Sequence, residues 1–218
     1  MTAQEIKKSA EVNIYIAKAD EALAALGYTE HSFAHVTKVA EAARDLLLAL
    51  GYPPRTAELA YIAGYMHDIG NVINRVDHAQ SGAVMAFRIL DHMGMEAGEI
   101  ATVVSAVGNH DEGTAFPVNE VAAALILGDK TDVRRSRVRN EDFATFDIHD
   151  RVNYAVEEAH TELDIAQKTL TLSLTIDTAI SPVMDYFEIF LERMLLCRKA
   201  GEKLGLRFCV TVNGQKVL

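Results

Sequence analysis

The sequence has little of what marks a secreted or membrane-bound protein. Only two cysteines occur, Cys197 and Cys209, with neither CxxC spacing nor a paired framework, so we expect a reducing compartment and two small buried hydrophobes. Residues 1–18 lack the apolar core of a signal peptide, because polar residues interrupt every apolar stretch. No uninterrupted apolar run approaches the roughly 20 residues that span a bilayer. These absences predict a cytoplasmic protein without a membrane partner.

Positive charge is also scarce. The 31 Asp and Glu residues outnumber the 21 Lys and Arg residues, and the resulting net charge of -10 argues against duplex nucleic acid as a partner. Any anion that the protein binds must therefore meet a local basic patch. Hydrophobic residues make up 50% of the 218 residues, which is enough for one good core and a small satellite layer.

Most of the chain has the apolar periodicity of helices. One apolar stripe runs over residues 36–50 and stops at Gly51, and a second runs over residues 59–69 and stops at Gly70. Further helices are expected at three places, which are about 79–93, 96–109 and 118–129. The pattern predicts a helical bundle, which we assign to a domain over residues 1–160.

The character changes after residue 160. Residues 170–176 and 206–212 alternate apolar and polar side chains at period two, and Asn213-Gly214 is a strong two-residue turn signal. Between them a helix is expected from Ser181-Pro182 to about Leu204. The predicted fold class is therefore mainly α, with a small C-terminal antiparallel β-sheet plus one helix over residues 161–218.

The most informative motif is His67-Asp68, at the end of the second apolar stripe. Neighbours inside a regular helix point about 100° apart, but at a frayed last turn both side chains can converge on one ion. Imidazole with carboxylate suits Zn, Mn, Fe or Co, and a further carboxylate and histidine would complete such a site. Candidates for these ligands lie on other predicted helices: His35, His78, His110 and Asp129. The remaining histidines are interpreted as structural: His31, His92, His149 and His160.

Over residues 31–135 the sequence resembles the HD-domain phosphohydrolase superfamily. The resemblance rests on a histidine, a central His-Asp pair and a distant aspartate in the family's order, which here are His35, His67, Asp68 and Asp129. The stretch MHDIGNV is similar to the commonest form of the central motif. The resemblance implies a helical core, a divalent metal cofactor (Mn, Fe, Zn, Co or Mg) and hydrolysis of phosphate esters.

Two more histidines resemble the additional ligands of two-metal members of that superfamily, such as the cyclic dinucleotide phosphodiesterases. These are His78, in DHAQSG, and His110, in GNHDEG. The chain departs from those enzymes where it has Asn109-His110 in place of a His-His pair, so a cyclic dinucleotide is not the first substrate expected. One ion and two ions are both compatible with the sequence.

A basic patch follows the last implied ligand. Five of the chain's basic residues lie within ten positions, and they are Lys130, Arg134, Arg135, Arg137 and Arg139. Arginine's planar guanidinium suits phosphate oxygens, and we expect Lys130 and Arg134 to bind the substrate. Asp68 is expected to be both a metal ligand and the acceptor of a hydrogen bond from the reacting water. The alternative for the patch is a solvated surface, and residues 131–148 are expected to be a lid or a solvated loop.

These observations favour a metal-dependent phosphohydrolase that cleaves a small phosphoester, such as a nucleotide, by metal-activated water. A di-iron oxygenase of the same superfamily would use an identical ligand set, but would not need the basic patch. A non-catalytic interaction module is the third hypothesis, because the C-terminal segment has no obvious catalytic residue and two apolar helix surfaces. Those surfaces are either intrachain core or the contact of a homodimer.

Overall fold

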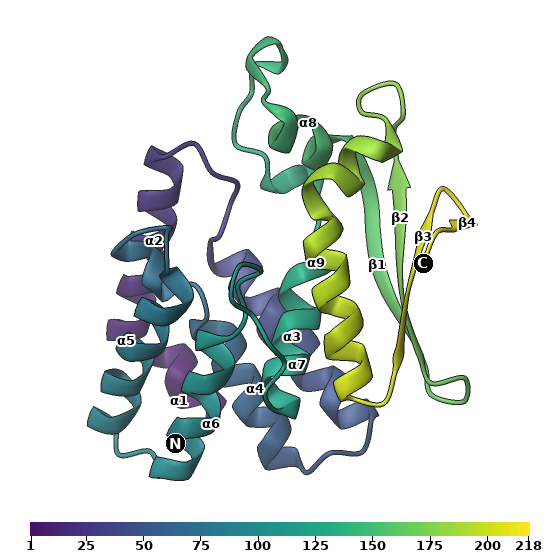
Figure 1. Ribbon diagram of the computed structural model, residues 1–218. Helices are drawn as coiled ribbons and strands as arrows, with labels where there is room; N and C mark the ends of the chain where they lie inside the picture. The colour runs from purple at the N-terminus through teal and green to yellow at the C-terminus, as the bar shows by residue number, and fades with distance from the viewer.

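The computed structural model describes residues 1–218 and places a helical bundle beside a small sheet (Figure 1). The bundle contains seven helices: α1 (Ala3–Lys8), α2 (Ala10–Ala25), α3 (Phe33–Ala49), α4 (Pro54–Met66), α5 (His78–His92), α6 (Ala97–Gly108) and α7 (Glu120–Lys130). Three short 3-10 helices interrupt the loops: η1 (Ile69–Val72), η2 (Arg135–Arg137) and η3 (Phe143–Thr145). The C-terminal part holds α8 (Ile148–Ala155), β1 (Val156–Asp164), β2 (Thr169–Ile176), α9 (Val183–Lys203), β3 (Arg207–Val212) and β4 (Gln215–Lys216). A mainly helical fold with a β appendage is thereby confirmed.

The helices begin and end where local signals place them. The Ser32 hydroxyl accepts a hydrogen bond from the amide of Ala34 at 3.2 Å and so caps α3. The same helix ends before Gly51, whose φ of 80° is a left-handed conformation that glycine adopts without strain. The three helices expected near 79–93, 96–109 and 118–129 are α5, α6 and α7.

Two glycines allow the close packing that positions the later site. A Cβ on Gly64 would lie 2.7 Å from the Cα of Ala40, so α3 and α4 approach to backbone contact there. A Cβ on Gly70 would collide with the backbone carbonyl of His78, so η1 and the start of α5 are equally close. Both contacts lie within a few residues of the His67-Asp68 motif.

The sheet has the order β1-β2-β3-β4 and is mixed rather than purely antiparallel. β1 pairs antiparallel with β2, and β3 pairs antiparallel with β4 across the predicted Asn213-Gly214 turn. β2 and β3 are parallel, with Leu170 opposite Phe208 and Leu174 opposite Val212. This corrects the predicted arrangement, because α9 carries the chain back along the sheet, so β3 starts at the same end as β2.

α9 lies between the sheet and the helical bundle (Figure 1). It packs against α7 on one side and β3 on the other, and a single cluster of 51 buried hydrophobic residues runs through both parts of the chain. Cys197 and Cys209 are buried and unpaired, as expected. The division of the chain into domains at residue 160 stays a prediction. No helix combines the length and the apolar character needed to cross a bilayer.

The segment 131–148 is partly packed against the bundle and partly exposed to solvent. Its first part is packed, because Val133 and Arg137 are buried and the Arg137 guanidinium donates to the carbonyls of Glu30 and Asp132. Its second part is exposed around Phe143. The structure thus divides the loop into a fixed segment beside the bundle and an open segment before α8.

Candidate metal centre

The six candidate ligands come together at one end of the bundle, because each lies at or near the end of a helix. His35 lies in the first turn of α3, His78 opens α5, and Asp129 lies in the last turn of α7. His67 is the C-cap of α4, and Asp68 follows it before η1 begins. His110 comes two residues after the end of α6. The helix break after Met66 is what lets the adjacent His67 and Asp68 face the same centre.

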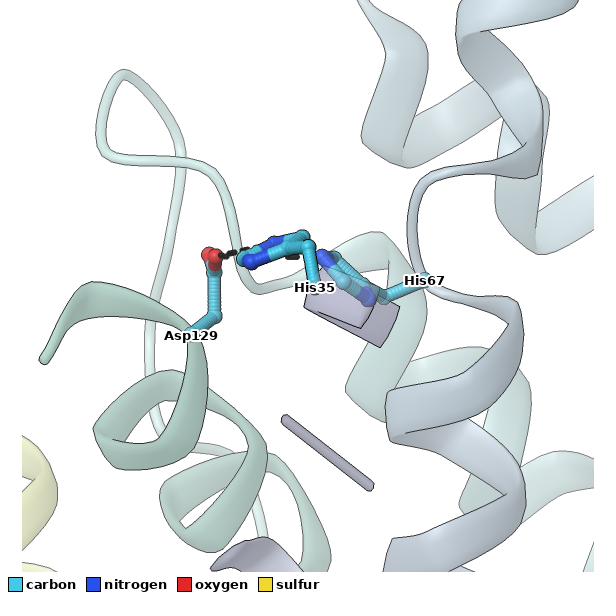
Figure 2. Close-up of side chains that lie close together, drawn as sticks. All are labelled: His35, His67 and Asp129. Atoms are coloured by element: carbon cyan, nitrogen blue, oxygen red, sulfur yellow. Dashed lines mark ion pairs between the residues drawn. The ribbon is translucent and has the colours of Figure 1, made fainter. Parts of the chain in front are cut away.

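A first cluster consists of His35, His67, Asp129 and one oxygen of Asp68. The Oδ1 of Asp129 lies 3.3 Å from His35 Nε2 and 3.7 Å from His67 Nε2. The Oδ2 of Asp68 lies 3.1 Å from His67 Nε2 and 3.7 Å from His35 Nε2. Figure 2 shows His35, His67 and Asp129 converging from separate elements. The donor atoms of these three residues lie within 4.8 Å of one another, which is close enough to hold one ion.

A second cluster uses the other oxygen of Asp68. Its Oδ1 lies 3.5 Å from His78 Nε2 and 4.0 Å from His110 Nε2. The two histidine Nε2 atoms are 3.2 Å apart. Two imidazole lone pairs so close repel each other unless a proton or a cation lies beside them, and the Nη1 of Arg75 lies 3.3 Å from His78 Nε2. Asp68 therefore lies between two pairs of histidines, with one carboxylate oxygen toward each.

The histidine tautomers are set by the partners of the Nδ1 atoms. Each Nδ1 faces an oxygen acceptor: Asp132 Oδ2 for His35 (2.8 Å), the Gly64 carbonyl for His67 (2.7 Å), the Arg75 carbonyl for His78 (3.0 Å) and the Val107 carbonyl for His110 (2.6 Å). A carbonyl can only accept, so Nδ1 carries the hydrogen. All four Nε2 lone pairs are then turned toward the centre, which is the usual arrangement of metal-binding histidines.

The unsatisfied atoms and the electrostatics of the cluster fit a cation. His35 Nε2, His67 Nε2 and Asp68 Oδ2 are buried without any hydrogen-bond partner, which proteins rarely tolerate. Burial opposes charge on Asp68, but His67 outweighs it and holds the pKa of Asp68 well below its usual range. Burial lowers the pKa of His110 to about 3, so its imidazole is neutral. A carboxylate surrounded by imidazoles is the donor set of divalent transition metals.

The cluster forms the floor of a cavity of about 520 Å³. Asp68, His78, His110 and Asp129 line it, while His35 and His67 lie behind them. Four basic side chains also line the cavity: Arg75, Lys130, Arg137 and Arg193. The opposite wall is built by the C-terminal part, with the N-cap Asp147 and His149, Asp150 and Asn153 from α8, and Ile189, Phe190 and Glu192 from α9.

The structure separates the two basic residues that the sequence favoured for substrate binding. Lys130 lines the cavity, and its Nζ lies 2.6 Å from Asp129 Oδ2. Burial lowers its pKa, but Asp129 and Glu112 outweigh burial, so the pKa of Lys130 is raised and the side chain stays charged. Arg134 does not line the cavity, because its guanidinium is paired with Asp132 and Glu30. The geometry thus gives no support to phosphate binding by Arg134.

Several residues near the centre were missed from the sequence. Asp132 accepts from His35 and lies 2.7 Å from the Nζ of Lys38. Its place three residues after Asp129 was the only available signal. His31, interpreted as structural, lines the cavity, and its ring centroid lies 5.4 Å from that of His35. His149 also lines the cavity, on the far wall.

Replacing Asp132 by asparagine is expected to weaken metal binding about 10- to 100-fold while the helical fold is kept, because the His35 ring loses the carboxylate that orients it. Metal titration followed by calorimetry measures the change. Asp45→Asn, on the exposed surface of α3, the helix that carries His35, is the control and should bind metal like the wild type. An unchanged affinity in Asp132→Asn would mean that Asp132 does not support the centre.

The structure is thus a helical protein with a buried His/Asp cluster that could hold a metal ion. Residues 32–132 match the family model of the HD domain. A relative from Methanocaldococcus jannaschii, itself described as an uncharacterized protein, is 27% identical over 161 residues. The match covers 64% of this chain and 62% of that relative. HD domains bind divalent metals, and a match to one indicates a hydrolase type of function. The description of the relative does not identify a substrate.

Proposed function

We propose that this protein is a metal-dependent phosphohydrolase that cleaves a small phosphoester, with a nucleotide as the favoured substrate. The observation that carries the proposal is the position of Asp68 between two histidine pairs on the floor of a cavity. A single carboxylate shared in this way is typical of a two-ion site. We accordingly propose His35, His67 and Asp129 for one ion, His78 and His110 for the other, and Asp68 for both.

The basic side chains of the cavity support a phosphorylated substrate. In an acidic protein, four of the basic residues line one cavity, and the cationic side chains of Arg75 and Lys130 stand beside the proposed ligands. The Nη1 of Arg75 lies 3.3 Å from His78 Nε2, and Lys130 contacts Asp129. Six carboxylates line the same cavity, from Asp68, Glu112, Asp129, Asp147, Asp150 and Glu192, so these cations and the proposed metal ions together would supply the positive charge that attracts an anion.

The residues have distinct roles in the proposed reaction. Bound divalent ions would lower the pKa of water toward neutrality and neutralise charge on the phosphoryl oxygens. Lys130 and Arg75 would bind and orient those oxygens from the cavity walls. Asp68 would accept a hydrogen bond from the reacting water, and the buried floor would keep other water away from it.

The far wall supports a leaving group of nucleoside type. A cavity of about 520 Å³ is in the range that takes small organic ligands. Tyr28, from the loop after α2, offers aromatic surface to a base, and Asp147 and Asp150 on the far wall offer acceptors to sugar hydroxyls. The same carboxylates would repel a long polyphosphate tail, so a nucleoside monophosphate fits this wall better than a triphosphate.

A substrate screen tests the proposal. Metal-stripped protein reconstituted separately with Mn, Fe, Zn, Co or Mg is incubated with phosphomonoesters, phosphodiesters, nucleotides and cyclic dinucleotides, and released product is measured. We expect metal-dependent cleavage of a nucleotide or a similar small phosphoester. Oxygen consumption by the ferrous protein without phosphoester cleavage would instead support a di-iron oxygenase. Absence of any turnover with both ions bound would support an interaction module.

Replacing Lys130 by glutamine is expected to lower kcat/KM by about tenfold or more, because a buried charge-assisted contact worth roughly 1.5 to 3 kcal/mol is lost. Initial rates at saturating metal measure this effect. Lys203→Gln, at the exposed end of α9, is the matched control and should behave like the wild type. Equal kcat/KM for Lys130→Gln and the control would remove Lys130 from the substrate site.

A further inference from the structure

Arg193 brings a charged group from the C-terminal part of the chain into the HD-domain cavity. It lies on α9, which runs between the helical bundle and the sheet (Figure 1). Its side chain is 23% exposed and lines the same cavity as Asp68 and Asp129. The C-terminal segment, which showed no obvious catalytic residue in the sequence, therefore contributes directly to the wall around the proposed metal centre.

The guanidinium of Arg193 is held in place by two contacts. Its Nε donates to Glu112 Oε1 at 2.7 Å, and its Cζ lies 4.4 Å from the ring centroid of Phe190. Neither Nη atom has a hydrogen-bond partner in the protein, and neither is enclosed as a buried unsatisfied atom. One edge of the planar group is thus fixed, and its remaining donors are open to a ligand in the cavity.

Glu112 connects Arg193 to the proposed metal centre. Its second oxygen, Oε2, lies 3.2 Å from Lys130 Nζ, which in turn lies 2.6 Å from Asp129 Oδ2. Burial opposes charge on Glu112, but Lys130 and Arg193 outweigh it and hold the pKa of Glu112 well below its usual range. The result is an alternating row of charges, from Arg193 through Glu112 and Lys130 to Asp129, that fixes two cations at set positions near the metal ligands.

We propose that Arg193 binds the phosphoryl oxygens of the substrate through its free Nη groups, and that α9 thereby completes the active site. This inference rests on the proposed phosphohydrolase function and deepens it. A guanidinium fork matches two oxygens of a phosphoryl group, and such contacts strengthen as charge develops in the reaction. Arg193 takes the part that the sequence suggested for Arg134, while Glu112 is a positioning residue for Arg193 and Lys130.

The test compares Arg193→Gln and Arg193→Lys with the control Arg198→Ala, an exposed arginine on the same helix. Inorganic phosphate is titrated calorimetrically into each metal-loaded protein, and kcat/KM is measured with the phosphoester that the wild type cleaves. For Arg193→Gln we expect phosphate affinity and kcat/KM to fall about 10- to 100-fold with unchanged metal content. The lysine variant should recover part of this loss because it keeps the charge without the fork.

The outcomes separate this inference from the function on which it rests. If wild-type protein cleaves a phosphoester and binds phosphate, and Arg193→Gln does both within about twofold of it, the inference is overturned and the function stands. If the metal-loaded wild-type protein neither cleaves any phosphoester nor binds phosphate, the proposed phosphohydrolase function is itself wrong. Circular dichroism and metal content verify that each variant is folded. If the glutamine variant is unstable, the phosphate affinity and kcat/KM of Arg193→Lys are compared with those of the wild type instead.

The positioning role of Glu112 is tested by a double-mutant cycle. If Glu112 acts on phosphate binding through Arg193, the loss of phosphate affinity in the double variant Glu112→Gln, Arg193→Gln is smaller than the product of the two single losses. Independent residues would give losses that multiply. A multiplicative result would overturn the positioning role, since a merely structural contribution of Glu112 does not depend on the presence of Arg193.

Discussion

Asp68→Asn is expected to lower turnover about a thousandfold and to abolish tight binding of both metal ions, because the shared carboxylate has no substitute in the cluster. Its two oxygens lie between His35 and His67 on one side and His78 and His110 on the other. The helical fold should persist, since Asp68 makes few contacts beyond the cluster and a hydrogen bond from Asn71. Metal analysis, initial rates and circular dichroism measure these effects.

Thermal unfolding gives a second readout for the same variant. An ion present at about 100 times its dissociation constant stabilises the folded wild type by about 2.7 kcal/mol, and this increment should disappear in Asp68→Asn. Asp77→Asn is the matched control, because Asp77 is exposed, caps no helix with its side chain and does not line the cavity. Full metal occupancy and full turnover in Asp68→Asn would refute the proposed centre.

The second large effect concerns the number of ions. Removing His78 or His110 by substitution with alanine should release one metal equivalent and most of the activity, while the other equivalent stays bound. The reason is that their Nε2 atoms lie beside Asp68 Oδ1 and each other, at the second cluster, whereas the first cluster keeps His35, His67 and Asp129. Loss of a complete ligand should exceed the 10- to 100-fold effects typical of supporting residues.

Equilibrium dialysis with elemental analysis counts the ions in each of these variants. His92→Ala is the control, since His92 is exposed at the end of α5 and away from the cluster. A mononuclear protein would behave differently, with its single tight ion retained in both His78→Ala and His110→Ala. That result would leave the site of His35, His67, Asp68 and Asp129 in place and remove the second ion from the proposal.

The helical part of the fold and the centre of the site followed from local patterns. Apolar periodicity and glycine stops placed α5, α6 and α7 within two residues of their ends. The order of His35, His67, Asp68 and Asp129 matched a family whose domain the comparison found at residues 32–132. Such features can be predicted from the sequence because each depends on residue type at a fixed spacing along the chain.

Features that depend on long-range geometry could not be predicted from the sequence. The alternation in β2 and β3 indicates strands, but period two is the same for parallel and antiparallel pairing, so the mixed sheet could not be distinguished. Likewise, Arg193 looks like any basic residue of an amphipathic helix, and only the packing of α9 against α7 brings it to the cavity. Arg134 was favoured because it lies close to Asp129 in the sequence, but its guanidinium is paired with Asp132.

Anomalous X-ray diffraction from crystals of the manganese-loaded protein tests the central claim most directly. We expect two anomalous peaks on opposite sides of Asp68, one beside His35, His67 and Asp129 and the other beside His78 and His110. The buried, unpartnered Asp68 Oδ2 and His67 Nε2 should both be within bonding distance of the first peak. No peak at the cluster, or a single peak with His78 and His110 turned away from it, would contradict the two-ion centre.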